Sequence, residues 1–412
     1  MTGPLYYYSV AELSEQVRSK NISPVQILEA CLSRIEALNP RLNAFITVFP
    51  TESRKLAREA EKDIEAGRLR GPLHGIPIAF KDFYDTAGSR TTAAFEHFKS
   101  RVPAHDAVTV AKLKAAGAIV IGKTNMHKLG MGTTGLDSAF GATRNPWNDE
   151  YIPGGSSSGS AAAVAAGLCY ATIDTDAIGS CRLPAACCGV VGFKATYGLI
   201  SGKGILDGEQ ADETILWLSH PGITTRSAGD TALVLTALTE GEKPGDRRDI
   251  QSNAKGDLKL RVGVAENVKA EPEIADAFKA GVGKLRELGY AIAAARAPFD
   301  TPPFGDLHAI ESDRKTIGER AFKDIDVLVL PTTSSIVPAV KDVSDNPQAL
   351  SPANTLFANY FGLPAVSVPC GFDKHGLPIG LQIVGSPGGE ASVLQVARQF
   401  EMAAGHMKHP IP

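Results

Sequence analysis

Residues 106–125 read DAVTVAKLKAAGAIVIGKTN. Apolar residues recur at helical spacing in the first half, Gly117 ends that pattern, and the following AIVIGK is a short run rich in β-branched residues. A helix, a glycine stop and a buried strand in this order are typical of a βαβ unit. The stretch therefore predicts an α/β fold.

The same alternation extends in both directions along the chain. Upstream, Ser9 and Ser23 are candidate N-caps, and Pro24 takes the first helical position behind Ser23. Helices are therefore predicted at 9–20, 23–40 and 51–67. Downstream, predicted helices and strands alternate: helices at 229–240, 272–289 and 390–405, and strands at 258–266, 324–333, 365–372 and 378–385. Residues 241–257 are polar and turn-rich, which predicts a linker or a subdomain crossing there.

Composition narrows the class of protein. The 412 residues, 43% of them hydrophobic, suffice for a large core. A formal net charge of −3 argues against nucleic-acid and acidic-membrane partners. No apolar run approaches the roughly 18 residues needed to span a bilayer, and the N-terminal MTGPLYYYSVAELSEQ lacks the features of a signal peptide.

Cysteines and histidines indicate a reducing compartment and no metal site. The six cysteines form no C-x-x-C pair and lie in apolar contexts, as is typical of reduced thiols in a cytoplasmic protein. The nine histidines lack the spacing of metal ligands. We therefore expect neither a metal nor structural disulfides.

Three segments carry polar residues suited to catalysis, and the first is GGSSSGSAAAVAAG at 154–167. A phosphate-binding loop would need a lysine after the glycines, and none is present. Residues 155–159 match G-x-S-x-G, but a nucleophile elbow follows a buried strand, whereas RNPWNDEYIP precedes this loop. A merely flexible loop would not explain the alanine-rich helix behind it. The pattern predicts hydroxyl groups presented from a rigid base.

The other two segments each allow two interpretations. In the segment 174–198, Ser180 follows a glycine and lies between Asp176 and Arg182, but a serine there could equally cap a turn. Lys81 ends the apolar run PIAFK, where burial would lower the pKa of its ammonium group. A lysine at a strand end is more commonly just solvated. Neither segment decides the question alone.

Taken together, the three segments resemble the amidase signature family. The matching stretches are AFKD at 79–82, GGSSSGS at 154–160, TDAIGSCRLPA at 175–185, CGVVGFKATYG at 188–198 and NYFGLPAVSVPCGF at 359–372. The resemblance covers nearly the whole chain. It implies a single catalytic domain over residues 1–412, with a large mixed β-sheet flanked by helices on both faces.

The resemblance implies a Ser-Ser-Lys relay and no cofactor. Ser180 falls at the nucleophile position, Ser156 at the bridging serine on a cis peptide, and Lys81 at the general base. A neutral lysine could take the proton of Ser180 through the intermediate hydroxyl and later return it to the leaving amine.

The resemblance also assigns supporting roles around the relay. The backbone N–H groups of the oxyanion hole would come from Ala177, Ile178, Gly179 and Ser180. Asp176 and Arg182 would brace this loop. The positions expected to contact substrate are Met131, Gly132 and Ser157.

Two departures from the family pattern bear on the substrate. Ile178 replaces a glycine; because a β-branched residue avoids positive φ, its backbone should be ordinary, and its side chain should narrow the acyl site in favour of small or narrow acyl groups. Residues 298–323 form a shorter segment than in most members, which predicts a more open site. That shortness argues against the A chain of a glutamyl-tRNA amidotransferase.

The sequence thus predicts a cytoplasmic amidase that hydrolyses a small-molecule carboxylic amide to acid and ammonia through an acyl-enzyme on Ser180. The alternatives are the A chain of an amidotransferase, a hydrolase of a urea-derived amide such as biuret or allophanate, and a silent scaffold in which Ile178 blocks chemistry. The amide itself is not identified by the sequence. A homodimer stays open as the oligomeric state.

Overall fold

The structure is a computed structural model that describes residues 3–239, 260–301, 306–343, 345–405 and 408–411. The polar crossing predicted at 241–257 lies outside the described residues. Strands from both sides of it belong to one sheet, with β1 to β6 before it and β7 to β11 after it.

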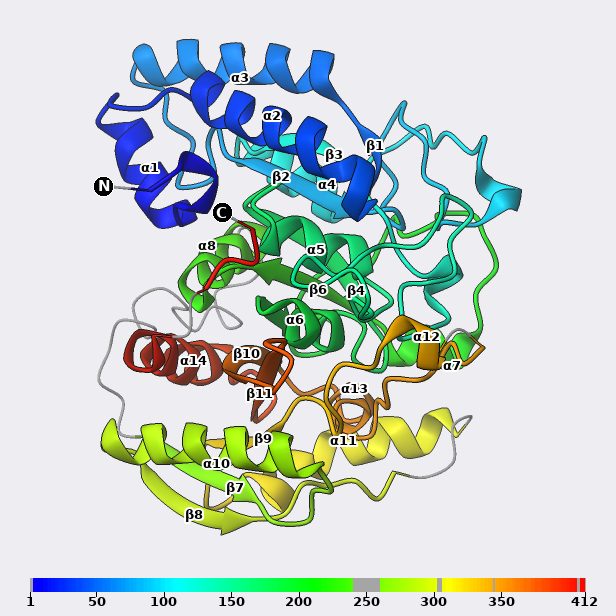
Figure 1. Cartoon of the computed structure of the whole chain (residues 1–412), viewed down its shortest axis with the longest axis vertical. Coiled ribbons are helices and arrows are strands. Elements are labelled where there is room, and N and C mark those ends of the chain that lie inside the picture. Colours follow the sequence, from blue (N-terminus) through cyan, green and yellow to red (C-terminus); the bar gives the residue numbers. More distant parts are fainter. Residues whose placement is uncertain (1–2, 240–259, 302–305, 344, 406–407, 412) are drawn as a thin grey trace.

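A mixed 11-stranded sheet runs along the long axis of the described chain (Figure 1). Its order is β1-β3-β2-β4-β6-β5-β10-β11-β9-β7-β8. The strands are β1 Phe45–Val48, β2 Pro77–Lys81, β3 Ile119–Thr124, β4 Ala171–Asp176, β5 Val191–Lys194, β6 His220–Thr225, β7 Arg261–Ala265, β8 Ala291–Ala295, β9 Val327–Pro331, β10 Ala365–Phe372 and β11 Pro378–Gly385. β2 runs parallel to β3 and β4, β7 runs parallel to β8 and β9, and the other pairs are antiparallel. The predicted fold class is confirmed.

Helices flank this sheet. The α-helices are α1 Val10–Arg18, α2 Pro24–Leu42, α3 Pro50–Glu65, α4 Val108–Ala115, α5 Ser158–Ala165, α6 Arg182–Cys188, α7 Glu213–Leu218, α8 Ala228–Thr239, α10 Pro272–Glu287, α11 Leu307–Ala321, α12 Val340–Val343, α13 Leu356–Tyr360 and α14 Glu390–Ala404. The 3₁₀ turns are η1 Leu5–Tyr7, η2 Glu96–Phe98 and η3 Lys128–Gly130. α5 and α6 pack together over the middle of the sheet, whereas α4, α8, α14 and α10 contact one another in succession.

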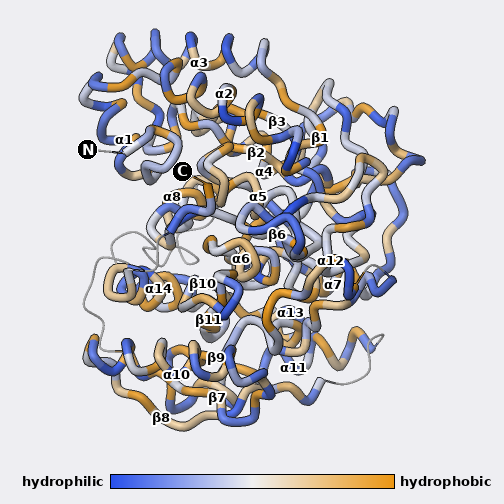
Figure 2. The backbone as a smooth tube through the Cα atoms, in the orientation of Figure 1, coloured by the Kyte–Doolittle hydropathy of each residue, from blue (hydrophilic) through white to orange (hydrophobic). Residues whose placement is uncertain are grey.

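The N-terminal helices begin where their caps predict. Ser9 and Ser23 each accept a hydrogen bond from the backbone of the third helical residue, whose side chain bonds back to complete a capping box. Pro24 is the first residue of α2. In Figure 2, the outer turns of α3 are hydrophilic and its hydrophobic segments lie toward α2.

The alanine-rich helix α5 is buried along its whole length. A Cβ atom at Gly159 would lie 2.3 Å from the backbone oxygen of Ala44, so only glycine allows this approach. Small side chains thus let α5 lie directly on β2, β3, β4 and β6. The rigid base predicted for the serine loop is present.

The prediction of one continuous loop at 174–198 is wrong. The segment contains the end of β4, helix α6 and strand β5. β4 reads ATIDTD and is buried at every position, although most of its residues are polar. Its polar side chains find partners inside the protein, so the usual hydrophobic signature of a strand is missing from the sequence.

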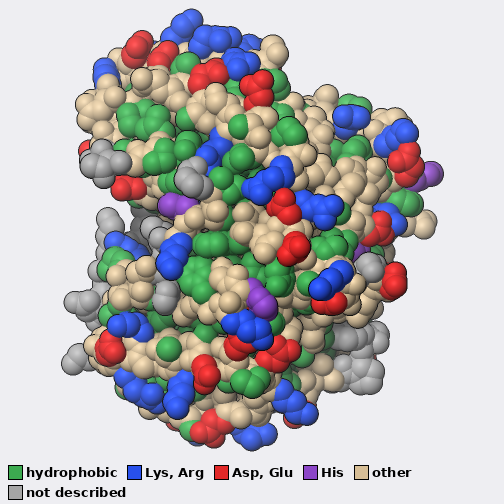
Figure 3. Space-filling model, viewed as in Figure 1, with side chains coloured by type: hydrophobic (Ala, Val, Ile, Leu, Met, Phe, Trp, Pro, Cys, Tyr) green, Lys and Arg blue, Asp and Glu red, His purple; other side chains and the backbone are tan. Residues whose placement is uncertain are grey.

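The surface shows no broad region of one charge on the face drawn in Figure 3, where basic and acidic side chains are interspersed. Within the described ranges, no helix is both long and apolar enough to cross a bilayer. The ends of the described chain meet, because the hydroxyl of Tyr7 and a guanidinium nitrogen of Arg34 donate to the backbone oxygen of Ile411 (Figure 1).

Candidate active site

The candidate site lies at the carboxyl ends of two parallel strands. Lys81 is the last residue of β2, and Asp176 is the last residue of the neighbouring strand β4. The serine loop leads into α5, which packs on both strands. Carboxyl ends of parallel strands are common positions for binding sites in α/β sheets.

Lys81 is completely buried and contacts three hydroxyl groups. Its Nζ lies 2.7 Å from Ser156 Oγ, 3.0 Å from Ser157 Oγ and 2.9 Å from Thr175 Oγ1. Burial lowers the pKa of Lys81 to about 8, and the negative charge of Asp174 opposes this shift. The amine can therefore lose its proton near neutral pH.

The backbone around Ser156 is tightly enclosed. The peptide bond between Gly155 and Ser156 is cis, as the family resemblance implies. A Cβ atom at Gly155 would lie 2.8 Å from the backbone oxygen of Gly132, so a side chain would not fit there. The N–H of His127 donates to the backbone oxygen of Ser156 at 2.9 Å. These contacts hold the hydroxyl of Ser156 against Lys81.

Ser180 lies beside the serine loop. Its backbone oxygen accepts a hydrogen bond from the N–H of Ser157 at 3.1 Å, and the residue is 5% exposed. Within the described residues, its hydroxyl has no hydrogen-bond partner. The structure thus joins Lys81 to Ser156 directly and joins Ser180 to the loop through the backbone, whereas no bond between the two serine hydroxyls is formed.

The predicted oxyanion loop supplies three free donors rather than four. Among the described residues, the N–H groups of Ala177, Ile178 and Ser180 have no acceptor. The N–H of Gly179 instead donates to Asp176 Oδ1 at 2.8 Å, so its predicted role as an oxyanion donor does not fit this structure. The carboxylate competes for that donor because it lies below the same turn.

Residues 178 and 179 have opposite backbone requirements. Ile178 is not among the described residues with positive φ, in agreement with the expectation for a β-branched residue. Gly179 has a φ of +130°, and a Cβ atom there would lie 2.3 Å from Thr355 Oγ1. The hydroxyl of Thr355 donates to the backbone oxygen of Ile178, which fixes the loop from the side of α13.

Asp176 and Arg182 form the bracing pair that the resemblance implies. Both are completely buried, and two nitrogens of Arg182 donate to the carboxylate, each at 2.9 Å. Arg182 also donates to Gln382 Oε1 and Asn359 Oδ1, each at 2.6 Å. Burial raises the pKa of Asp176, but the charge and hydrogen bonds of Arg182 outweigh burial, so its pKa lies well below the ordinary value.

Replacing Arg182 with methionine should lower the free energy of unfolding by about 3–5 kcal/mol, because the Asp176 carboxylate would stay buried without its counter-ion. Urea unfolding at neutral pH measures this loss. The exposed pair Arg261–Asp326 provides the control, and Arg261→Met should cost less than about 1 kcal/mol. Equal losses in the two variants would contradict the bracing role.

The three predicted substrate contacts differ in placement. Met131 is 62% exposed, and its backbone oxygen accepts from Gln348. A Cβ atom at Gly132 would lie 2.2 Å from the ring of His127, so this glycine allows close packing. The hydroxyl of Ser157 contacts Lys81 and the backbone oxygen of Thr175. Ser157 thus belongs to the surroundings of the lysine rather than to an open substrate surface.

Sequence reasoning missed several residues of the site. Thr175 supplies the third hydroxyl at Lys81, and its only signal was its place at the start of TDAIGS. Asn359 donates to the backbone and carboxylate oxygens of Asp176. Asp174, completely buried beside Lys81, also passed unnoticed.

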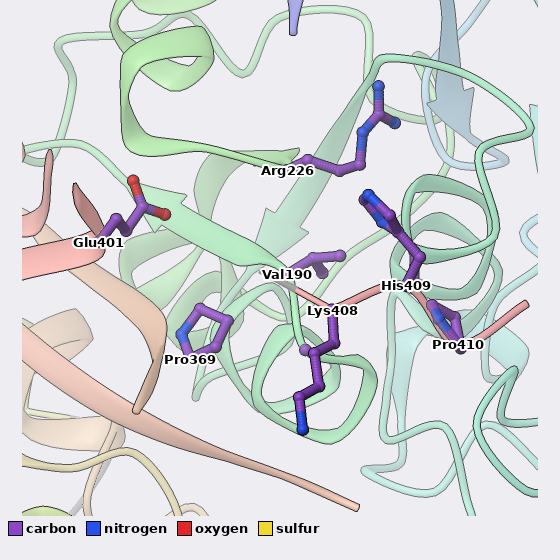
Figure 4. A pocket seen from close by; sticks show the side chains of 9 residues that line it. Val190, Arg226, Pro369, Glu401, Lys408, His409 and Pro410 are labelled. Carbon is purple, nitrogen blue, oxygen red and sulfur yellow. The ribbon is translucent and has the colours of Figure 1, made fainter. Parts of the chain in front are cut away.

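The cavity drawn in Figure 4 is separate from the relay residues. It lies between Arg226, Glu401 and the C-terminal residues Lys408, His409 and Pro410, and none of the predicted site residues lines it. Its volume of about 20 Å³ suits about one water molecule. In the part of the chain that the structure describes, no group of three or more His, Cys, Asp or Glu is arranged to hold a metal ion.

An α/β fold with a buried lysine, neighbouring serine hydroxyls and free backbone donors defines a serine hydrolase that would use lysine as its base. The sequence profile of the amidase family matches residues 26–303 and 308–394. The chain belongs to this family.

Individual relatives agree with this assignment. The chain is 34% identical to the A chain of glutamyl-tRNA(Gln) amidotransferase from Geobacter metallireducens, covering 97% of this chain and 98% of the relative. It is 35% identical to the corresponding chain from Thiobacillus denitrificans, covering 98% of both. The first alignment spans 481 positions, more than the 412 residues of this chain, so the relative has segments that this chain lacks.

Solved structures share the whole fold. A 6-aminohexanoate cyclic dimer hydrolase in complex with its substrate has a TM-score of 0.83 and 28% identity, covering 98% of each chain. The peptide amidase of Stenotrophomonas maltophilia has a TM-score of 0.84 and 27% identity, covering 99% of each chain.

Proposed function

We propose that this amidase hydrolyses a small carboxylic amide to acid and ammonia through an acyl-enzyme on Ser180. The observation that carries the proposal is the 2.7 Å contact between the buried amine of Lys81 and the hydroxyl of Ser156. Because burial brings the pKa of Lys81 to about 8, its neutral form can accept a proton under ordinary conditions. The chain acts as one catalytic domain, since one sheet includes strands from both halves.

In the acylation step, the oxygen of Ser180 forms a bond with the amide carbon. Its proton passes to the oxygen of Ser156, whose own proton passes to Nζ of Lys81. The carbonyl oxygen becomes an oxyanion and accepts hydrogen bonds from the free N–H groups of Ala177, Ile178 and Ser180. Lys81 is then an ammonium group.

The same path in reverse completes the reaction. The proton returns from Lys81 through Ser156 to the nitrogen of the amide as its bond to carbon breaks, and ammonia leaves. Water then attacks the acyl-enzyme and gives up a proton along this route, which releases the acid and restores Ser180. No step requires a cofactor.

A panel of short aliphatic, aromatic, malonyl-type and ureido amides tests the proposal by ammonia release. Hydrolysis of one class by the purified chain is the expected result. The absence of ammonia from every class, together with an absence of serine labelling, would favour the silent scaffold.

The pH dependence of hydrolysis should follow Lys81. The relay needs a neutral amine, and the pKa of Lys81 is about 8, so protonation disables the base below that value. We expect kcat/KM to rise about tenfold per pH unit up to about pH 8 and then to level off. Initial rates at low substrate concentration measure this profile. A profile that stays flat through neutral pH would contradict an essential lysine base.

Ile178 should limit the acyl group. Its side chain adds bulk to the loop that provides the oxyanion donors, so an Ile178→Gly variant should gain activity toward longer or wider acyl groups relative to short ones. We expect about a tenfold change in the ratio of kcat/KM values, the effect of one or two methylene groups in a pocket. An unchanged preference across an acyl-length series would refute this role.

Ammonia transfer within an amidotransferase is a second candidate. The A chains of glutamyl-tRNA(Gln) amidotransferases from Geobacter metallireducens and Thiobacillus denitrificans, 34% and 35% identical to this chain, favour it. The segments that this chain lacks favour the hydrolase. Ammonia release by the purified chain alone would support hydrolysis, and release only with added partner proteins would support transfer.

The proposal places the enzyme in the cytoplasm as a homodimer. All six cysteines are buried and free, as expected for a reducing compartment. Light scattering of the purified protein tests the homodimer, and a mass of about one chain, 43.4 kDa, would exclude it.

A further inference from the structure

A buried carboxyl group lies next to the proposed base without forming an ion pair with it. Asp174 is completely buried, and its Oδ1 has no hydrogen-bond partner among the described residues. Its Oδ2 accepts hydrogen bonds from Thr224 at 2.6 Å and Thr172 at 3.0 Å. Two hydroxyl donors on one oxygen favour the ionised form of the acid.

The sheet register explains why Asp174 lies close to Lys81. β2 and β4 run parallel, with Ala79 opposite Thr172 and Phe80 opposite Ile173. The next pair in this register is Lys81 and Asp174. Neighbouring strands are about 4.8 Å apart, and side chains of paired residues lie on the same face of a sheet. The bond from Thr172 to Asp174 confirms that these alternate residues share that face.

We propose that Asp174 is a positioning residue for the base: its buried carboxylate stabilises the ammonium group that Lys81 becomes when it takes the proton from Ser156. The inference rests on the proposed function of Lys81. During acylation the carboxylate gains and loses no proton, and its charge balances the ammonium while the oxyanion is held by backbone N–H groups. Water, which would otherwise solvate the ammonium, has no access to the completely buried Lys81.

The electrostatic surroundings are consistent with this role. Burial lowers the pKa of Lys81, and among the charges that raise it again Asp174 is the largest, ahead of Cys181 and Asp176. Asp176 is already paired with Arg182. Burial raises the pKa of Asp174, and hydrogen bonds from Ser160 and Thr224 oppose that shift together with the charge of Lys81.

Other titratable groups around Asp174 are uncharged. The hydroxyl of Tyr84 donates to the backbone oxygen of Asp174, and burial raises the pKa of Tyr84 well above its ordinary value. Burial likewise raises the pKa of Cys181 and Cys169 well above that of a free thiol. Lys81 is therefore the cation that responds to the charge of Asp174.

The test is a direct titration of Lys81 by NMR of protein labelled at the lysine side chains, with Lys81→Met identifying the signal. In Asp174→Asn, which keeps the shape of the acid but removes its charge, the Lys81 midpoint should fall by about one pH unit. The rising limb of kcat/KM should move to lower pH by the same amount. An unchanged or higher midpoint would overturn the inference.

Asp230→Asn is the matched control. Asp230 is also buried, but it lies on α8 and accepts a hydrogen bond from the N–H of Ala11. Its replacement should leave the Lys81 midpoint unchanged. A similar fall in both variants would show a general loss of structure and would also overturn the inference.

A second variant covers the case in which Asp174→Asn does not fold. Thr224→Val removes one donor to the same carboxylate and keeps the acid. Because the ionised form is then less favoured, the Lys81 midpoint should again fall, by less than one unit. No fall would overturn the inference.

The two proposals can fail separately. Full activity of a Ser180→Ala variant would refute the acyl-enzyme, while the NMR midpoint would still report the effect of Asp174 on Lys81. An inactive Ser180→Ala variant together with an unchanged midpoint in Asp174→Asn would refute only the role of Asp174.

Discussion

Ser180→Ala is expected to lower kcat for amide hydrolysis by at least about 10⁴-fold, because no other hydroxyl combines the exposure and the backbone donors of this position. Ser180 directly follows the loop that provides free N–H groups at Ala177 and Ile178. Removal of its oxygen leaves the binding surface and the donors in place, so the loss should appear in kcat rather than in KM.

The control for this variant is Ser367→Ala. Ser367 is completely buried on β10, and its hydroxyl lies 2.7 Å from that of Thr332, far along the sheet from β2. Its loss should affect stability and leave kcat unchanged. Ammonia release by Ser180→Ala at a rate near that of the wild type would contradict a serine acyl-enzyme.

Lys81→Met is expected to lower kcat by about 10³-fold, the usual contribution of a general base. Methionine keeps the length and apolar character of the side chain. Lys81 takes part in no ion pair in the described structure, so the substitution should cost little stability. Ser156, Ser157 and Thr175 would lose their shared amine, and the rise of activity toward pH 8 should disappear with it.

Lys123→Met is the matched comparison, because Lys123 is also completely buried. Its Nζ lies 3.3 Å from Asp82 Oδ1. The substitution leaves that acid without its counter-ion and should lower the free energy of unfolding by about 3–5 kcal/mol. A Lys81→Met variant that keeps its activity, or that loses activity only by unfolding, would contradict the assignment of Lys81 as base.

Local patterns allowed the prediction of the residues that meet at the site. The serine caps of α1 and α2, the small residues of α5 and the lysine at the end of β2 each have a local physical reason that is visible in the sequence. The close contact between Lys81 and Ser156, separated by 75 residues in the chain, followed from the family motifs alone.

Other features depend on partners that are distant in the sequence. β4 was missed because the partners of its polar side chains lie on other elements, such as Thr224 on β6 and Asn359 on α13. The acceptor of the Gly179 N–H depends on the turn after β4. The proximity of Asp174 to Lys81 requires the parallel pairing of β2 with β4, and no local pattern indicates that pairing.

Fluorophosphonate labelling followed by peptide mapping tests the central claim most directly, because the reagent bonds to an activated serine without needing the right amide. The account predicts a single adduct on Ser180, formed slowly or not at all in Lys81→Met and Ser156→Ala. An adduct on Ser156 or Ser157 in the wild type, or labelling of Ser180 at an undiminished rate in both variants, would contradict the relay from Lys81 through Ser156.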